Sequence, residues 1–324
     1  MLSNLSEPTL PGDRFEWKYF NFPVGWEDSL HRTRMSGPVC RAVTVMSAIF
    51  ALAMSSATAA AESAPGESDP APAACSLAAA SVTRTVNGQP YLLRVPSGLT
   101  GAAPLLVALH GGGSNPSRHE TQSGWTPFAA QQKFIVAYPQ GGKDDVTDPN
   151  RPDDRSWYFE NGNRHDVDFL QQVIADIESH WCVDTKRVYM SGHSNGGQMT
   201  SRMACAASAQ LGAVAMYAGG SHGGCEDGVP IRKLSFGFFT ADNDFTQVPV
   251  YAAHLQWRGT IGCSNDAATE SGPEVAEGYR YSCEQGANVV WRKYKAGSHD
   301  WPSGDRGADV RNRMWQLFQN HPLP

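Results

Sequence analysis

The sequence lacks a run of basic residues and lacks any pair of cysteines at C-x-x-C spacing. Lys and Arg number 26 among 324 residues, the net charge is −6, and only 18% of the residues are charged. Nucleic-acid-binding proteins usually carry a basic patch, so this charge pattern argues against a nucleic-acid partner. The missing C-x-x-C spacing argues against a zinc ribbon or a thioredoxin-like motif. We therefore expect neither a metal nor a cofactor.

A long apolar run is also lacking, except for one short stretch near the start. Residues 42–54 follow Arg41 and precede the small-residue segment ATAAA at 57–61, which fits a signal-peptide cleavage site. A permanent membrane helix needs about 20 apolar residues, so an uncleaved anchor is the weaker alternative. We expect a signal peptide at 35–61, a non-native upstream extension at 1–34, and a secreted or periplasmic protein with no stable membrane insertion after cleavage.

Cysteine usage agrees with export. Of seven cysteines, Cys40 lies in the expected signal peptide. Six remain, an even number that fits three disulfides in an oxidising compartment but permits 15 pairings. The six are Cys75, Cys182, Cys205, Cys225, Cys263 and Cys283.

Residues 62–74 are rich in Pro, Ala and Ser and indicate a flexible lead-in, whereas 75–324 alternates strand and helix signals. Short apolar runs predict strands, and apolar residues at helical spacing predict helices between them. This alternation is typical of an α/β fold with a mostly parallel sheet covered on both faces, in one domain. Residues 259–288 are expected to be a loop-rich excursion. The predicted strands are 91–95, 105–109, 134–138, 188–190, 213–217, 234–239 and 289–294, and the predicted helices include 168–177, 195–208 and 310–318.

The strongest chemical signal is Gly192-His193-Ser194-Asn195-Gly196, a Gly-x-Ser-x-Gly motif between a predicted strand and a predicted helix. In α/β-hydrolases a serine on this sharp turn is the nucleophile, and small neighbours are required on both sides. The helix that follows points its positive end at the reacting centre. A glycine-rich turn with a capping serine is the alternative. We expect Ser194 to be the nucleophile of an acyl transfer.

The strand at 105–109 ends in His110-Gly111-Gly112-Gly113. In this fold one oxyanion N–H comes from the residue after the nucleophile and another from this loop. The first would be Asn195 and the second Gly112, because glycine lets the backbone approach a substrate carbonyl closely. We expect His110 to brace the loop and not to transfer protons.

The acid and the base follow from the chain order Ser, then Asp or Glu, then His. His299 stands after a strand-like run and before the last predicted helix, where a loop base is expected. Asp242 stands just after the predicted buried strand 234–239 and is the favoured acid. Asp244, two residues later, is the alternative.

These segments together resemble the secreted esterases of carbohydrate esterase family one and the related polyhydroxybutyrate-depolymerase-like group. The matching pieces include LLVALHGGG, FIVAYPQG, CVDTKRVYMSGHSNGGQM and GSHDWP, and they run from about Tyr91 to Pro302. The resemblance implies Ser194 as nucleophile, Asp242 as acid and His299 as base, and a disulfide between Cys263 and Cys283. One departure is FFT at 238–240, where the family usually has His-Gly-Thr.

The resemblance implies an ester substrate that is polysaccharide-linked or a polyester. A feruloyl ester of plant polysaccharide is our first expectation, with acetylated xylan and polyhydroxybutyrate next. Trp157, Tyr158 and Trp301 are candidates to stack on a sugar or phenolic group, with ordinary packing as the equal alternative. A non-catalytic carbohydrate-binding protein on the same fold is the alternative from another class.

Overall fold

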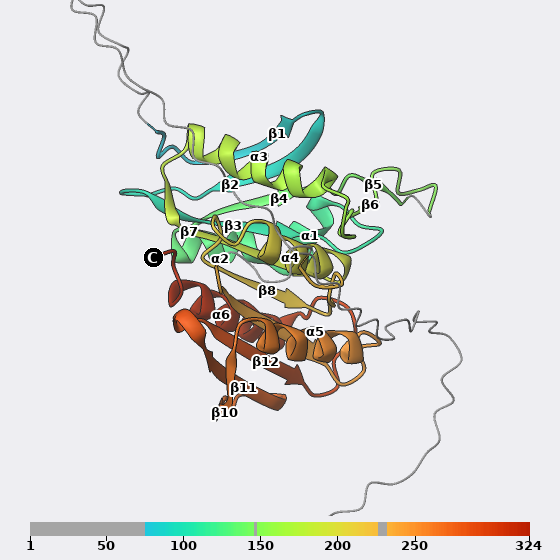
Figure 1. Ribbon diagram of the computed structural model, residues 1–324. Helices are drawn as coiled ribbons and strands as arrows, with labels where there is room; N and C mark the ends of the chain where they lie inside the picture. Colours follow the sequence, from blue (N-terminus) through green and yellow to red (C-terminus); the bar gives the residue numbers. More distant parts are fainter. Residues whose placement is uncertain (1–74, 146–147, 226–231) are drawn as a thin grey trace, which may run out of the picture. The chain divides into compact units, whose positions relative to one another are not determined.

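The computed structural model describes residues 75–145, 148–225 and 232–324 (Figure 1). The expected upstream extension, signal peptide and lead-in, which together span 1–74, lie outside the described residues. The described residues all fall in one compact unit, which is built on a ten-stranded sheet.

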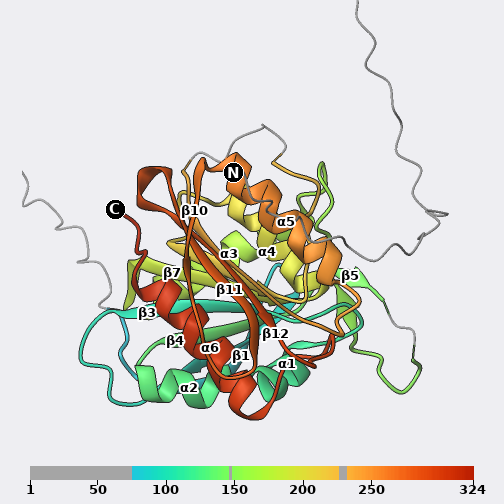
Figure 2. The same cartoon turned by 90° about the horizontal axis from the view of Figure 1, so that it is seen from below.

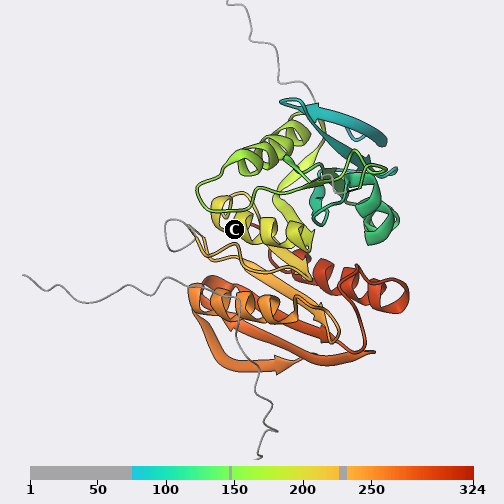
Figure 3. The same cartoon turned by 90° about the vertical axis from the view of Figure 1, so that its right-hand side faces the viewer.

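The sheet has the strand order β1-β2-β4-β3-β7-β8-β9-β12-β11-β10. Its six inner strands, from β4 to β12 in that order, run parallel, and the strands outside them pair antiparallel. In Figure 3 the hairpin β1–β2 (blue) and the hairpin β10–β11 (orange) lie at opposite ends of the sheet. The strands are β1 Ala80–Val86, β2 Gln89–Val95, β3 Ala103–Leu109, β4 Ile135–Pro139, β7 Val183–His193, β8 Ala213–Tyr217, β9 Ser235–Ala241, β10 Cys263–Thr269, β11 Val275–Cys283 and β12 Asn288–Tyr294; a separate small sheet pairs β5 Lys143–Asp144 with β6 Arg155–Ser156.

Helices cover both faces of the sheet. Figure 2 shows α3, α4 and α5 on one face and α1, α2 and α6 on the other. The helices are α1 Pro116–Ser123, α2 Trp125–Gln132, α3 His165–His180, α4 Asn195–Ala206, α5 Gln247–Thr260 and α6 Gly304–Gln319. None of the helices in the described ranges has the length and apolar character that crossing a bilayer requires.

The sequence of β3, APLLVAL, explains why the sheet has two cores. All seven residues are buried. Because side chains alternate across a strand, Leu105 and Val107 join the core under α3, α4 and α5, whereas Leu106 and Ala108 join the core under α1, α2 and α6. A strand buried on both faces is continuously apolar, and this is why the inner strands were predictable.

The prediction that residues 259–288 form a loop-rich segment is wrong. Most of it forms the antiparallel hairpin of β10 and β11, which extends the sheet beyond β12. The sequence CSNDAAT of β10 is exposed at six of its seven positions. An edge strand of this kind has no buried face to impose an apolar alternation, so its pattern resembles that of a loop.

Three disulfides cross-link the described part of the chain: Cys75–Cys182, Cys205–Cys225 and Cys263–Cys283. The pairing of Cys263 with Cys283 is therefore confirmed, and the other two pairings, which the sequence left open, are resolved. Cys263 and Cys283 also face each other in the register of β10 and β11.

Candidate active site

Ser194 stands at the carboxyl edge of the parallel sheet, between β7 and α4. Its backbone has φ 53° and ψ −120°, a conformation that a non-glycine residue adopts only where the surroundings enforce it. A side chain at Gly192 would lie 2.1 Å from the carbonyl oxygen of Gly196, and one at Gly196 would lie 2.3 Å from the carbonyl oxygen of His110. Both glycines are thus required by close backbone contacts, and the turn presents the hydroxyl above the sheet.

The structure brings His299 to Ser194. Nε2 of His299 lies 2.7 Å from the Ser194 hydroxyl oxygen, and Nδ1 lies 2.9 Å from Oδ1 of Asp244. His299 belongs to the loop after β12, and Asp244 to the turn after β9, so three strand ends supply the three groups. Because the carboxyl ends of parallel strands meet at one edge of a sheet, residues 105 positions apart in the chain become neighbours.

Asp244 is a fixed, buried acceptor. Its Oδ2 accepts a hydrogen bond from the Thr240 hydroxyl at 2.9 Å, and its Oδ1 accepts one from the backbone N–H of Thr246 at 2.8 Å. Burial on its own would raise the pKa of Asp244, but the hydrogen bonds from His299, Thr246 and Thr240 outweigh burial and hold the pKa below its ordinary value. The carboxylate therefore stays ionised and can hold a protonated Nδ1 on His299.

The expectation for Asp242 is corrected by this geometry. Asp242 is exposed, and its Oδ1 lies 3.5 Å from Nζ of Lys293 and not beside an imidazole. After β9 the chain turns back, with the N–H of Asp244 donating to the carbonyl of Ala241 at 3.1 Å. This turn aims the second aspartate, and not the first, at His299. Position at a strand end could not show which way the turn closes.

Gly112 and Asn195, the expected oxyanion donors, lie side by side. Asn195 is the first residue of α4, where backbone N–H groups have no partner within the helix. Gly112 is exposed, and a Cβ on it would be 3.3 Å from Cβ of Asn195. A Cβ on the preceding residue, Gly111, would be 3.5 Å from Cβ of Ser194. The glycine loop therefore lies close to both Ser194 and Asn195.

His110 braces the glycine loop. The N–H of Gly141 donates to its Nε2 at 2.9 Å, so the proton resides on Nδ1, which lies 2.7 Å from the carbonyl oxygen of Gly111. Complete burial lowers the pKa of His110 to about 4, which keeps the ring neutral. A neutral, doubly bonded ring suits a structural part, as we expected.

His193 is a residue that the sequence reasoning missed. Its Nε2 lies 2.7 Å from the backbone carbonyl oxygen of His299, and burial lowers its pKa to about 4. The Tyr217 hydroxyl donates to the carbonyl of Ser298 at 3.2 Å. These two bonds hold the loop that carries His299 against the nucleophile turn. The variable position of Gly-x-Ser-x-Gly gives no signal of such a contact.

The fold and this geometry can be compared with known proteins. No protein-family model matches the chain. An acetyl xylan esterase from Aspergillus awamori superposes with a TM-score of 0.54 over 72% of this chain and 94% of its own, at 16% identity. The chain has the α/β-hydrolase fold.

Sequence relatives of this α/β-hydrolase-fold chain confirm the resemblance. Feruloyl esterase C of Emericella nidulans is 30% identical over 145 residues, which are 44% of this chain and 51% of the relative. Poly(3-hydroxyalkanoate) depolymerase C of Paucimonas lemoignei is 33% identical over 132 residues, 40% of this chain and 30% of the relative. The match thus spans about half of the first relative and less than a third of the second.

Trp157 and Trp301, which we expected to stack on a substrate, do not have rings that a substrate could reach. That expectation is corrected. Trp157 is completely buried, and its indole N–H donates to the carbonyl of His110 at 2.8 Å. Trp301 is also buried and packs edge-on against Trp125 and His119. Tyr158 is partly exposed but lies against His165. Position on a loop could not reveal that tertiary packing covers the two tryptophans.

Phe245, and not Trp157 or Trp301, is the exposed aromatic side chain next to His299. It is 78% exposed, and its ring centre lies 4.1 Å from that of His299. It opens an apolar surface along α5 whose members, the α5 outer face, are all exposed: Phe245, Val248, Pro249, Tyr251, Ala252 and Leu255. A sequence signal exists, since no Asp, Glu, Lys or Arg occurs from 245 to 257. An exposed helix usually carries charge on its outer face.

Within the described ranges, no group of three or more His, Cys, Asp or Glu side chains is arranged to hold a metal ion. The residues that meet at the sheet edge instead provide an alcohol, an imidazole, a carboxylate and backbone N–H groups. These are the components of nucleophilic acyl transfer.

Proposed function

We propose that this protein is a carboxylic ester hydrolase that works through an acyl-enzyme, with Ser194 as nucleophile, His299 as base and Asp244 as acid. The observation on which this proposal mainly rests is the pair of hydrogen bonds, at 2.7 Å and 2.9 Å, that join the three side chains. The similarity to feruloyl esterase C and to other ester hydrolases supports the same conclusion.

The proposed reaction has two steps. Nε2 of His299 takes the hydroxyl proton as the Ser194 oxygen attacks the ester carbonyl, and Asp244 stabilises the imidazolium that forms. The N–H groups of Asn195 and Gly112 donate to the developing oxyanion. His299 then protonates the departing alcohol. In the second step His299 activates a water, which releases the acid and regenerates Ser194.

A fluorophosphonate probe tests the mechanism directly. The wild-type chain should be labelled at Ser194, and Ser194→Ala should be unlabelled and inactive on nitrophenyl acetate. Absence of labelling in a folded wild-type chain would favour the non-catalytic carbohydrate-binding alternative.

The substrate we propose is a feruloyl ester of plant polysaccharide. Several relatives carry the name feruloyl esterase. The exposed ring of Phe245 beside His299 gives an aromatic acyl group a stacking partner at the reacting centre. Hydrolysis of methyl ferulate, nitrophenyl acetate, hydroxybutyrate polymer and a peptide anilide should be compared, and kcat/KM should be highest for methyl ferulate among the soluble compounds.

A polyester is the second candidate substrate, and the α5 outer face favours it. Contiguous exposed apolar patches often mark interaction sites. The surface begins at His299 and includes Val248 at 72% exposure. A depolymerase of poly(3-hydroxyalkanoate) is among the relatives. Release of soluble acid from hydroxybutyrate polymer, at a rate above that of methyl ferulate cleavage, would select this candidate.

We also propose that the protein is exported. Three disulfides tie the described part of the chain, which suits an oxidising compartment. Sequencing the amino terminus of the exported protein should find a start shortly after the ATAAA segment at 57–61.

A further inference from the structure

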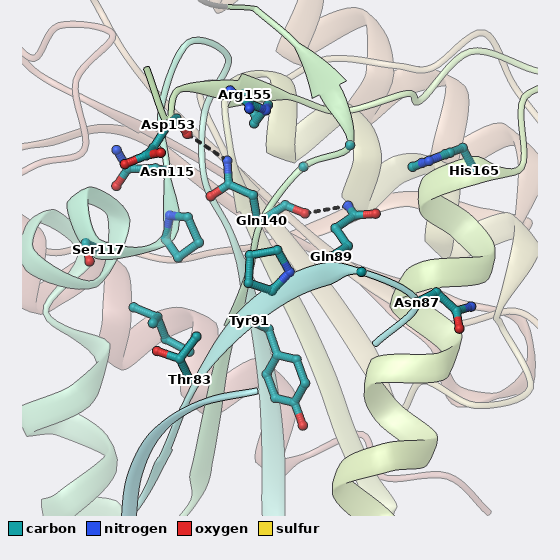
Figure 4. Close-up of a pocket in the computed structure, with 16 residues that line it drawn as sticks. Thr83, Asn87, Gln89, Tyr91, Asn115, Ser117, Gln140, Asp153, Arg155 and His165 are labelled. Carbon is teal, nitrogen blue, oxygen red and sulfur yellow. Dashed lines mark hydrogen bonds between the residues drawn. The ribbon is translucent and has the colours of Figure 1, made fainter. Parts of the chain in front are cut away.

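A groove of about 660 Å³ lies where the β1–β2 hairpin meets the start of α1 (Figure 4). It is formed by the turn of the β1–β2 hairpin, the start of α1, the segment after β4 and the segment around β6. None of the three triad residues lines it. Its volume falls in the range of small-molecule sites, about 300 to 1,000 Å³.

Neutral carboxamides dominate the polar lining. Asn87, Gln89, Asn115 and Gln140 come from three different parts of the chain and surround the groove together with two hydroxyl side chains, Thr83 and Ser117. A carboxamide offers both donors and acceptors, and a hydroxyl group does the same. This lining therefore matches a ligand that is itself rich in hydroxyl groups.

The amides are held in place by the protein. Nε2 of Gln89 donates to the carbonyl of Gln140 at 2.6 Å, and Nε2 of Gln140 donates to the carbonyl of Asp153 at 2.9 Å (Figure 4). In the described part of the chain, neither of their Oε1 atoms accepts a hydrogen bond. Each side chain is thus oriented through its NH₂ group and keeps its oxygen for a ligand, so little side-chain entropy is lost on binding.

The charge of the lining disfavours an anion. Arg155 is the one arginine or lysine among the lining residues, and its Nη1 donates to the carbonyls of Pro152 and Asp154 at 2.9 Å and 2.8 Å. Asp144, which is not among the lining residues, lies 3.7 Å from that same atom, and Asp153 supplies the one carboxylate of the lining. The wholly apolar side chains of the lining are those of Pro90, Leu92 and Pro116. A neutral polyhydroxyl compound, a carbohydrate, fits best.

The groove adjoins the reacting centre through the glycine loop. Asn115 follows Gly112 by three residues, a span of at most about 11 Å. The N–H of Gly113 donates to Oγ of Ser156 at 3.2 Å, and a Cβ on Gly141, a groove residue, would collide with the carbonyl of that same serine. Ser156 therefore lies against both the glycine loop and the segment after β4 that lines the groove.

We infer that this groove is a subsite for sugar residues of the polysaccharide that carries the ester, on the alcohol side of the bond to be cleaved. The inference rests on the proposed ester hydrolysis. It predicts that affinity for a sugar-linked ester depends on groove residues, whereas cleavage of an ester without sugar does not.

Two variants test the subsite in the full chain. Gln140→Ala removes an acceptor, and Ser117→Trp fills the groove from an exposed position in the first turn of α1. Gln122→Trp is the matched control, because Gln122 is exposed on the same helix but does not line the groove. Both groove variants should raise KM for feruloylated arabinoxylan oligosaccharide at least fivefold with kcat retained. Both groove variants should keep kcat/KM for methyl ferulate within about twofold of the wild-type value. The control variant Gln122→Trp should keep kcat/KM within about twofold for both substrates.

Binding without chemistry provides a second readout. Ser194→Ala should bind unesterified arabinoxylan oligosaccharide in a calorimetric titration, and Ser194→Ala combined with Ser117→Trp should not. If the wild type cleaves methyl ferulate but no sugar binding or KM change is found, the subsite is refuted and the hydrolase stands. If sugar binds and no ester is cleaved, the hydrolase is refuted and the groove stands as a binding site.

Discussion

His193 donates from Nε2 to the backbone carbonyl of His299 over 2.7 Å, so the residue before Ser194 holds the loop that carries His299. His193→Ala should lower kcat roughly fivefold with little change in KM, because one positioning hydrogen bond contributes about 1 kcal/mol. His193→Gln retains a donor and should recover most of kcat. Steady-state kinetics on nitrophenyl acetate measure both values, and equal losses in the two variants would contradict the positioning role.

Asp244 and Asp242 allow a sharp comparison, since they are two residues apart and only Asp244 contacts His299. Asp244→Asn should lower kcat roughly 10⁴-fold, because an amide cannot hold the required imidazole tautomer. Asp242→Asn, the matched control, should stay within about twofold. Thermal melting of both variants checks that they fold. A large loss in the Asp242 variant alone would return the acid to that residue.

Phe245 should affect substrates according to their acyl group. Phe245→Ala should raise KM for methyl ferulate about fivefold, corresponding to roughly 1 kcal/mol of aromatic contact, and leave nitrophenyl acetate nearly unchanged. Tyr251→Ala, further along α5, is the control and should change neither. Equal effects on both esters would argue against stacking of the acyl group on this ring.

The remainder of the α5 outer face bears on the polyester candidate. Val248→Ser with Leu255→Ser should reduce adsorption to a hydroxybutyrate polymer film and the rate of its hydrolysis, while nitrophenyl acetate turnover stays constant. Val82→Ser provides the control, since Val82 is 38% exposed and lies on β1. Unchanged adsorption would leave the α5 outer face without a part in polymer binding.

His254 should make folding stability depend on pH. The ring is packed among Phe238, Tyr281 and Trp291, and burial, assisted by Arg258, lowers its pKa to about 4. The unfolded chain binds this proton near pH 6.5. The free energy of unfolding should therefore decrease as pH falls from 6.5 towards 4, because His254 binds its proton more tightly in the unfolded chain than in the folded one.

His254→Phe keeps the aromatic packing and removes the titrating group. Denaturant titrations should show a smaller loss of unfolding free energy between pH 7 and pH 4.5 than in the wild type. His321→Phe, near the carboxyl end, is a milder comparison because the pKa of His321 is lowered less. An unaltered pH slope in His254→Phe would mean that other groups cause the acid sensitivity.

The predictable parts of this molecule were those fixed by local constraints. The inner strands are apolar without interruption, and the turn at Ser194 needs glycines at fixed positions, so both are visible in the sequence. His299 was predicted from chain order together with its place after a strand-like run and before the last predicted helix, and it lies next to Ser194.

The unpredictable parts depend on how segments meet. The turn after β9 decides between Asp242 and Asp244, and packing by α1, α2 and α6 covers Trp301. Disulfide pairing was open because six thiols permit many combinations, and only the tertiary fold brings Cys75 to Cys182.

Trp157 has a consequence for the timing of catalysis. Its indole N–H donates to the carbonyl of His110, and its backbone N–H donates to the Asn195 side chain at 2.7 Å, so a single residue ties together the two segments that we propose to hold the oxyanion. We expect this arrangement to be in place before any substrate arrives. The reaction should accordingly start at full speed on mixing, with no lag for a closing movement.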